Sequence, residues 1–109
     1  MHFKTTELFD KQAKKLNKRY HNLKIDIEDL LVRFEAYHQQ SICIKKNLYK
    51  IRLKNSNKNK GKRAGYRVYY YIKLEESVYL LTIYDKSEIT MIDESLLIDI
   101  INDLEKKES

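Results

Sequence analysis

The stretch RVYYYIKLEESVYLLTIY, residues 67–84, decides the fold, because two runs of alternating residues flank a short acidic break. Alternation with a period of two, rich in Tyr, Val and Ile, is typical of half-buried β-strands. Glu75 and Glu76 occupy the break, so we expect the two strands to form an antiparallel hairpin that turns there. A third alternating run, LYKIRL at residues 48–53, predicts a third strand of the same meander.

Apolar residues at helical spacing flank the three predicted strands. One stripe extends over residues 9–20, a second over 23–37 and a third over 96–104. We therefore expect an α+β fold, in which an N-terminal helical hairpin packs on a three- to four-stranded antiparallel sheet, followed by a C-terminal helix. Residues 2–4 are the candidate for a short edge strand. One face of the sheet would pack on the helices and the other would face solvent.

The chain has 109 residues, which is enough for one domain, and we assign residues 1–109 to it. No apolar run approaches the roughly 20 residues that span a bilayer, and the residues after Met1 do not resemble a signal peptide. The single cysteine, Cys43, cannot form an internal disulfide, which agrees with a reducing compartment. These features predict a cytoplasmic protein with no membrane partner.

Charge is distributed unevenly along the chain. No Asp or Glu lies between Ala36 and Leu74, yet this segment holds eleven of the 22 Lys and Arg residues. Its densest part, KNSNKNKGKRAGYR at residues 54–67, contains six basic residues and both glycines. A basic segment between acidic flanks is typical of a surface that binds nucleic-acid phosphates, although basic surfaces also bind acidic proteins and membranes.

The strand pattern predicts which basic residues lie together. The turn places Arg67 opposite Tyr84 or Asp85, and symmetric closure of the long connection around Asn59 and Lys60 places Arg52 opposite Arg67. Arg52, Arg67 and Tyr84 would then form a row about 10 Å long on the face away from the helices. Because two facing arginines repel each other, this row favours an anionic ligand over a purely structural role. The alternative is a solvated face from which long side chains reach water. The row would be bordered by Lys50, Lys54, Tyr69, Tyr71 and Lys86.

Three segments of the chain carry a family resemblance: LYKIRL at 48–53, GKRAGYRVYY at 61–70 and YLLTIYDKSE at 79–88. In this order and spacing they resemble the core of the RelE/ParE superfamily of toxins, and the HigB-type members most. The resemblance implies the toxin of a type II toxin–antitoxin system. Such a toxin is a ribosome-dependent mRNA endonuclease, which cleaves translated mRNA, inhibits translation and is held in check by a cognate antitoxin protein.

The resemblance also implies roles for individual residues. The arginine of the family's G-x-R motif falls on Arg67. Ser87 stands where RelE-type members have a further arginine, and residues 89–97 lack the tyrosine that is catalytic in that type. Tyr84 belongs instead to the HigB-like pattern. The other basic positions of the family fall on Lys50, Arg52, Lys54 and Lys86.

RNA cleavage by its own 2′-hydroxyl requires an aligned oxygen, stabilised charge on the phosphorane and two proton transfers. Arg52 and Arg67 would hold the phosphate, and one of Tyr84, Lys86, Lys54 or Glu88 would supply each proton step. All three histidines lie in the N-terminal helical part, so a histidine pair is not expected. No metal or small-molecule cofactor is expected either. The predicted catalytic residues are Arg67, Lys86, Tyr84 and Lys54, and the predicted RNA-binding residues are Lys50, Arg52, Lys58, Lys60, Lys62, Arg63, Tyr69 and Tyr71.

Two other functions fit the same residues. A ParE-like gyrase poison would damage DNA without cutting RNA, and a non-catalytic nucleic-acid-binding module would use the basic face without chemistry. The basic row of Lys50, Arg52, Lys54 and Arg67 favours RNA cleavage over the gyrase poison. The expected partners are therefore the antitoxin, the ribosome with its rRNA, and mRNA.

Overall fold

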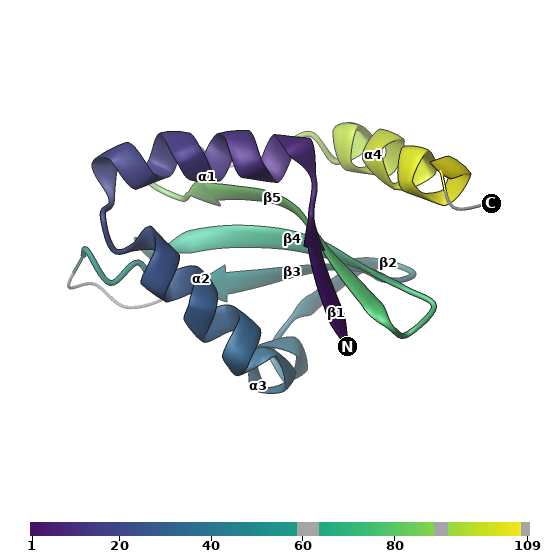
Figure 1. Cartoon of the computed structure of the whole chain (residues 1–109), viewed down its shortest axis with the longest axis horizontal. Coiled ribbons are helices and arrows are strands. Elements are labelled where there is room, and N and C mark those ends of the chain that lie inside the picture. The colour runs from purple at the N-terminus through teal and green to yellow at the C-terminus, as the bar shows by residue number, and fades with distance from the viewer. Residues whose placement is uncertain (59–63, 89–91, 108–109) are drawn as a thin grey trace.

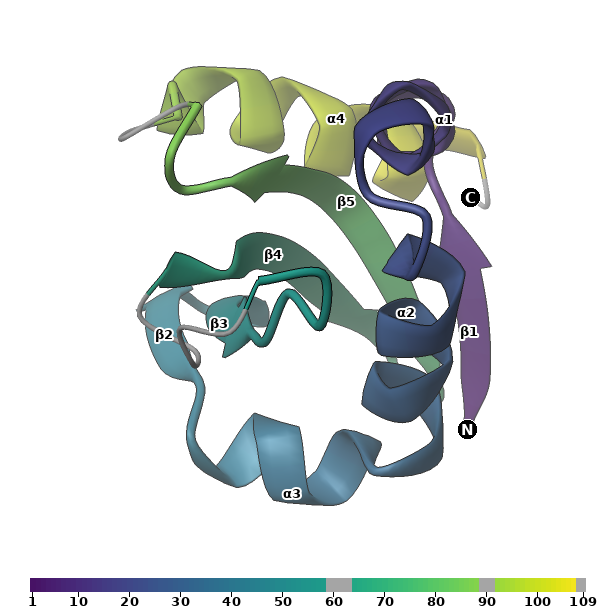
Figure 2. The same cartoon turned by 90° about the vertical axis from the view of Figure 1, so that its left-hand side faces the viewer.

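A computed structural model gives the structure of the chain and describes residues 1–58, 64–88 and 92–107. Within these residues, five strands form one sheet in the order β1-β5-β4-β3-β2 (Figure 1). The helices α1, α2 and α3 pack on one face of the sheet and α4 packs on the other, as Figure 2 shows in a view along α1. The elements are β1 (His2–Thr5), α1 (Glu7–Arg19), α2 (Leu23–Val32), α3 (Phe34–Gln39), β2 (Ile42–Lys45), β3 (Leu48–Leu53), β4 (Tyr66–Lys73), β5 (Ser77–Asp85) and α4 (Glu94–Lys107).

The expectation of a three- to four-stranded antiparallel sheet is wrong, because the sheet has five strands and is mixed. The meander β3-β4-β5 is antiparallel as predicted, but β1 pairs in parallel with β5, from His2 beside Ser77 to Thr5 beside Leu80. No hairpin joins β1 to β5, so local alternation carries no information about their relative direction. β2 adds the other edge strand, and its four residues are too short and too exposed to show a pattern.

The N-terminal helices depart from a simple hairpin. Thr6 caps α1, because its side-chain oxygen accepts a hydrogen bond from Phe9 N at 3.0 Å. The apolar stripe that predicted a single second helix is divided at Arg33, whose backbone leaves the helical conformation. In Figure 1 the resulting α2 runs obliquely below α1 and leads into the short α3. Together with α1 they bury a core on the first face that includes Phe9, Leu30, Phe34, Val68, Tyr70 and Leu80.

The second face of the sheet was expected to face solvent, but α4 covers part of it. Leu97 of α4 is fully buried there. Near the C-terminal end of α4, Glu105 accepts a hydrogen bond from the Tyr71 hydroxyl at 2.5 Å, and Leu104 O accepts one from Lys73 Nζ at 3.3 Å. α4 therefore lies over the end of the sheet near the β4–β5 turn. The sheet residues packed in this second cluster are Leu48, Tyr69, Tyr71, Tyr79, Leu81 and Tyr84.

The β4–β5 hairpin contains an irregularity that the sequence pattern did not predict. The pairing shifts by one residue between Tyr69 and Tyr70, so that Leu81 has no partner across the ladder. A bulge of this kind moves the side chains beyond it to the opposite face.

Among the described helices, none combines the length and apolar character required to cross a membrane.

Candidate RNA-binding site

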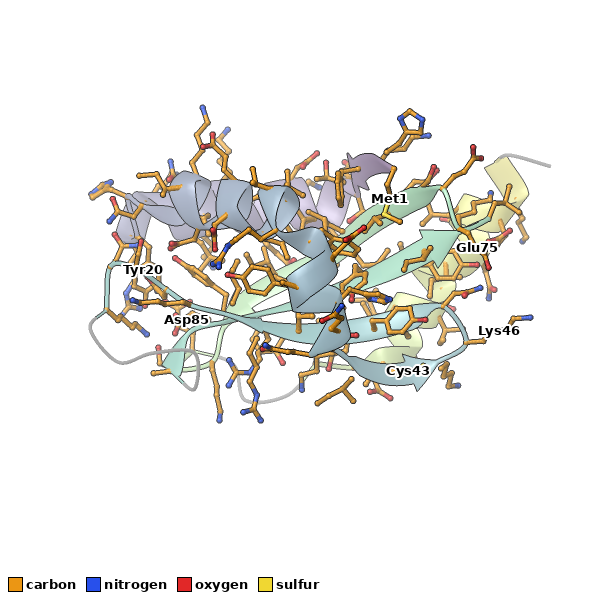
Figure 3. All side chains as sticks on the ribbon, turned by 90° about the horizontal axis from the view of Figure 1, so that it is seen from below. Met1, Tyr20, Cys43, Lys46, Glu75 and Asp85 are labelled. Atoms are coloured by element: carbon orange, nitrogen blue, oxygen red, sulfur yellow. The ribbon has the colours of Figure 1, made fainter. Side chains whose placement is uncertain are left out.

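The structure pairs the three residues of the predicted row across neighbouring strands. Arg52 of β3 lies opposite Arg67 of β4, and Arg67 lies opposite Tyr84 of β5, which confirms both predicted pairings. The row lies one residue from the end of the sheet that Asp85 marks. In Figure 3 this end carries the Tyr20 and Asp85 labels, whereas Glu75 is at the opposite end. α4 packs nearer that opposite end, so the row lies beside the part of the face that α4 covers.

The three side chains of the row differ sharply in exposure. Arg52 is exposed, whereas Arg67 is only 4% exposed and Tyr84 only 3%. The expectation of an exposed Arg67 is therefore wrong. Its Nη1 donates a hydrogen bond to Tyr66 O at 3.2 Å, which holds the guanidinium against the sheet. Because a buried cation depends on its partners, replacement of Arg67 will affect stability as well as any ligand.

The electrostatics of the site reflect its crowded cations. Burial lowers the pKa of Arg67, and the positive charge of Arg52 lowers it further. Burial also lowers the pKa of Lys50, and the guanidinium groups of Arg67 and Arg52 add to this effect. Within the described residues, no carboxylate forms an ion pair with Arg52. A bound phosphate would relieve this mutual repulsion, which makes the row a candidate anion site.

The tyrosines around the row are not free to stack on bases. Tyr69 is only 3% exposed, and burial together with the neighbouring Tyr84 raises its pKa to about 12. The Lys50 ammonium lies 5.5 Å from the centre of the Tyr69 ring. Tyr71 packs under α4 and is bonded to Glu105, at the other end of the face. Tyr69 is thus a buried neighbour of the row and contacts Lys50. Tyr71 lies under α4, away from the row, where it is too buried for the predicted contact with RNA.

Two lysines extend the row toward the end of the sheet. Lys54 directly follows β3 and Lys86 directly follows β5, and both are exposed. Lys86 N donates a hydrogen bond to Gly65 O at 3.1 Å, so these lysines flank the start of β4. Glu88, the one carboxylate considered for a proton step, instead forms an ion pair with Arg19 of α1. Of the residues predicted for proton transfer, Lys54, Lys86 and Tyr84 therefore lie in or beside the row.

Part of the predicted basic connection has a structural role. Lys58 Nζ forms an ion pair with Asp85 Oδ1 at 2.7 Å and lies 5.2 Å from the centre of the Tyr20 ring. The side chain of Lys58 is therefore engaged within the protein, and its role in RNA binding stays a prediction. Three other predicted RNA-binding residues, Lys60, Lys62 and Arg63, lie outside the described residues.

A buried network around Asp85 was missed by the sequence interpretation. Asp85 is fully buried and accepts hydrogen bonds from Asn55 Nδ2 at 3.1 Å and from Ser87 N at 2.9 Å, in addition to the Lys58 ammonium. Asp26 of α2 accepts a further bond from Ser56 N at 3.0 Å. These carboxylates attach residues 55–58 to the sheet and to α2. In the sequence, only the position of Asp85 at the end of an apolar strand indicated this network.

Gly65 explains how the two arginines come to face each other. A Cβ atom at this position would lie 2.2 Å from the carbonyl oxygen of Leu53. Only glycine therefore lets the chain enter β4 so close to the end of β3. This close approach fixes the register in which Arg52 meets Arg67.

The remaining candidates for chemistry lie elsewhere. His38 Nδ1 lies 2.6 Å from the Tyr70 hydroxyl, and its ring stacks on Phe34 in the core of the first face. Within residues 1–58, 64–88 and 92–107, no three His, Cys, Asp or Glu side chains are placed to share a metal ion.

No protein-family model matches the chain, and no curated protein is similar enough to be called a relative.

Proposed function

We propose that the chain is a ribosome-dependent mRNA endonuclease, the toxin of a type II toxin–antitoxin system, and that Arg52, Arg67 and Tyr84 form its phosphate site. The observation that carries this proposal is their pairing across three adjacent strands. Support also comes from the family resemblance, because its three segments coincide with β3, with β4 and the residues before it, and with β5. On this proposal the protein acts on ribosomes in the cytoplasm, and a cognate antitoxin would cover the basic face.

The proposed reaction needs only the RNA itself and groups at this site. The 2′-oxygen of the substrate attacks the adjacent phosphorus, a new P–O2′ bond forms and the P–O5′ bond breaks. Arg52 and Arg67 stabilise the negative charge that builds on the non-bridging oxygens. A base takes the proton of the 2′-hydroxyl and an acid protonates the leaving 5′-oxygen. Tyr84, Lys54 and Lys86 are the candidates for these two transfers.

The proposed dependence on the ribosome follows from the lack of a strong general base among the groups at this site. The pKa of Tyr84 is raised by burial, so its phenol suits the acid step better than the base step at neutral pH. The depressed pKa of Lys50 makes a neutral amine easier to form in the cluster, but Lys50 lies two residues before Arg52 along β3 and outside the row. A ribosome that holds the message in an in-line geometry would supply the alignment that the protein lacks.

The sharpest test compares Arg52→Gln and Tyr84→Phe with the wild type after brief induction, by mapping transcript ends. Arg52 is exposed, so its loss should remove phosphate binding without unfolding the chain. Tyr84→Phe keeps the buried ring and removes only the hydroxyl. We expect cleavage within translated codons by the wild type and a decrease of about 10²-fold or more in each variant.

Tyr71→Phe is the matched control, because it also removes one hydroxyl from the same face, but under α4 and away from the row. Its cleavage should equal that of the wild type once protein levels are matched. Unchanged cleavage in Arg52→Gln would refute the phosphate site. Accumulated DNA breaks without RNA ends would instead support the gyrase poison, and neither signal would support a non-catalytic binding module.

A further inference from the structure

A cleft of about 480 Å³ opens between α1 and the C-terminal end of β5, on the far side of β5 from the arginines. β1 pairs with β5 only as far as Leu80, so among the described residues no strand lies beside the edge of β5 beyond this point. α1 runs along this open edge instead, and the cleft lies between them. Its lining includes Tyr84, which is also the last member of the phosphate row.

Gln12 of α1 takes the place of the missing strand. Its Oε1 accepts hydrogen bonds from Ile83 N at 3.0 Å and from Thr82 Oγ1 at 2.6 Å. A backbone N–H can only donate, so the atom that faces it must be the amide oxygen. The orientation of the Gln12 amide is therefore fixed, and its two N–H donors are directed away from the strand. Gln12 lines the cleft, so these donors are available at its wall.

The rest of the lining suits a nucleoside. Leu16 and Ile83 supply an apolar surface, and the edge of Tyr84 joins the cleft to the row. Lys15 is exposed at the cleft and can reach a phosphate outside it, and the ion pair between Arg19 and Glu88 lies at its boundary. An oriented amide beside apolar walls and a cation is the combination that recognises a base by hydrogen bonds to its edge.

We propose that this cleft binds one base of the RNA, and that the amide nitrogen of Gln12 donates a hydrogen bond to a carbonyl oxygen of that base. The inference rests on the proposed function for the identity of the ligand as RNA. It adds a specificity element, because guanine and uracil present such an oxygen, whereas adenine presents an amino group at the corresponding 6-position. A base held here would lie next to Tyr84, one strand away from Arg67.

Inosine 5′-monophosphate and adenosine 5′-monophosphate provide a closely matched pair of probes, because they differ only in the oxygen or amino group at position 6 and in the proton that N1 carries in inosine. Titration of the ¹⁵N-labelled protein with each nucleotide can be followed by NMR through the Gln12 side-chain amide and the Ile83 backbone amide. We expect inosine monophosphate to shift both signals and to bind about three- to tenfold more tightly than adenosine monophosphate.

Gln12→Glu is the decisive variant. A carboxylate can still accept the bonds from Ile83 N and Thr82 Oγ1, so the fold is retained, but it has no donors to offer. The preference should therefore vanish or reverse toward adenosine monophosphate, whose amino group can donate. Asn17→Asp makes the same amide-to-carboxylate change on a different side of α1, where Asn17 borders a separate hollow, and should leave the preference unchanged.

An equal ratio of the two affinities in the wild type and Gln12→Glu would overturn the inference, as would the absence of any Gln12 shift at the highest soluble nucleotide concentrations. These measurements do not involve cleavage. If transcripts are cut but the ratio is insensitive to residue 12, the proposed function stands and this inference fails. If transcripts are not cut but the wild type prefers inosine monophosphate, the base site stands and the nuclease proposal fails.

Discussion

At the scale of single residues, the most consequential side chain outside the row is Asp85. It is fully buried, yet it can carry a negative charge, because it accepts hydrogen bonds from Asn55 Nδ2, Ser87 N and Ser87 Oγ and forms an ion pair with Lys58. Burial opposes ionisation, but the bonds from Lys58, Ser87 and Asn55 outweigh it and lower the pKa of the carboxyl. Asp85 thus anchors the basic connection to the sheet immediately behind the phosphate row.

Asp85→Asn should destabilise the protein at neutral pH by about 2–4 kcal/mol, because the amide cannot accept all of these bonds and Lys58 loses its partner. The folded-state pKa of Asp85 lies below its unfolded-state value, so its contribution is complete above about pH 4. The contribution is lost as the pH falls through the folded-state pKa. The difference between wild type and variant, measured by urea unfolding across this range, should therefore shrink on acidification. A constant difference down to about pH 3 would contradict this account.

The alternation in β3, β4 and β5 was sufficient to predict the pairing of Arg52, Arg67 and Tyr84, because one turn and one symmetric connection fix the register. The burial of Arg67 was not predictable, because exposure depends on neighbours from other elements. The pair of Lys58 with Asp85 spans 27 residues, and no local pattern connects them. For the same reason Gln12 carried no signal, since its partners lie 70 residues away.

At the scale of elements, the β4–β5 turn contains an unfavourable backbone. Leu74 and Glu75 have φ angles of 54° and 59°, both in the left-handed region, and Glu76 N donates to Lys73 O at 3.1 Å. A four-residue turn whose two central residues are both left-handed is of type I′, which strongly favours Asn-Gly at these positions. A leucine that is 77% exposed and a glutamate at these positions are therefore poor choices for stability.

The double variant Leu74→Asn with Glu75→Gly should stabilise the fold by about 1–2 kcal/mol, because Asn and Gly tolerate the left-handed conformation at lower cost. A higher midpoint of urea unfolding with an unchanged slope would report this gain. Glu76→Gly makes the same Glu-to-Gly change one position later, where no left-handed φ relieves its entropic cost, and should lower stability instead. If Glu76→Gly stabilised the protein as much as the double variant Leu74→Asn with Glu75→Gly, the turn conformation would be excluded as the cause.

The elements that the sequence failed to predict share a physical cause. β1 was expected as a short edge strand at residues 2–4, but its parallel pairing with β5 was not, because its partner is more than 70 residues away. β2 was missed altogether, because its four residues are too few to show alternation. The bulge beside Leu81 changes the face of neighbouring side chains without changing the apolar composition. Similarly, the break at Arg33 leaves the helical stripe intact, so the pattern alone indicated one continuous helix. Periodicity detects that an element exists, but tertiary contacts decide its partners and interruptions.

At the scale of the whole molecule, the cations of the basic middle segment that the structure describes do not form one continuous binding surface. Lys73 lies at the end of the sheet near α4, where Glu105 Oε2 is 3.7 Å away, and Lys58 is held by Asp85. The cations that the fold leaves together are fewer, and they surround Arg52 at the Asp85 end. Net charge along the sequence therefore overstates the number of phosphate contacts, and a salt titration can count the real ones.

Binding of a single-stranded oligouridylate should weaken with salt, and the slope of log K against log salt should fall by about 0.7 for each phosphate contact removed. We expect Arg52→Gln with Lys54→Gln to reduce the slope by about 1.4, because both side chains are exposed beside the row. Lys14→Gln with Lys18→Gln removes the same charge from exposed positions of α1 and should leave the slope nearly unchanged. Equal reductions in the two double variants would mean that binding responds to net charge alone. In that case RNA would not occupy a defined site on the sheet, and the row of arginines would lose its proposed role.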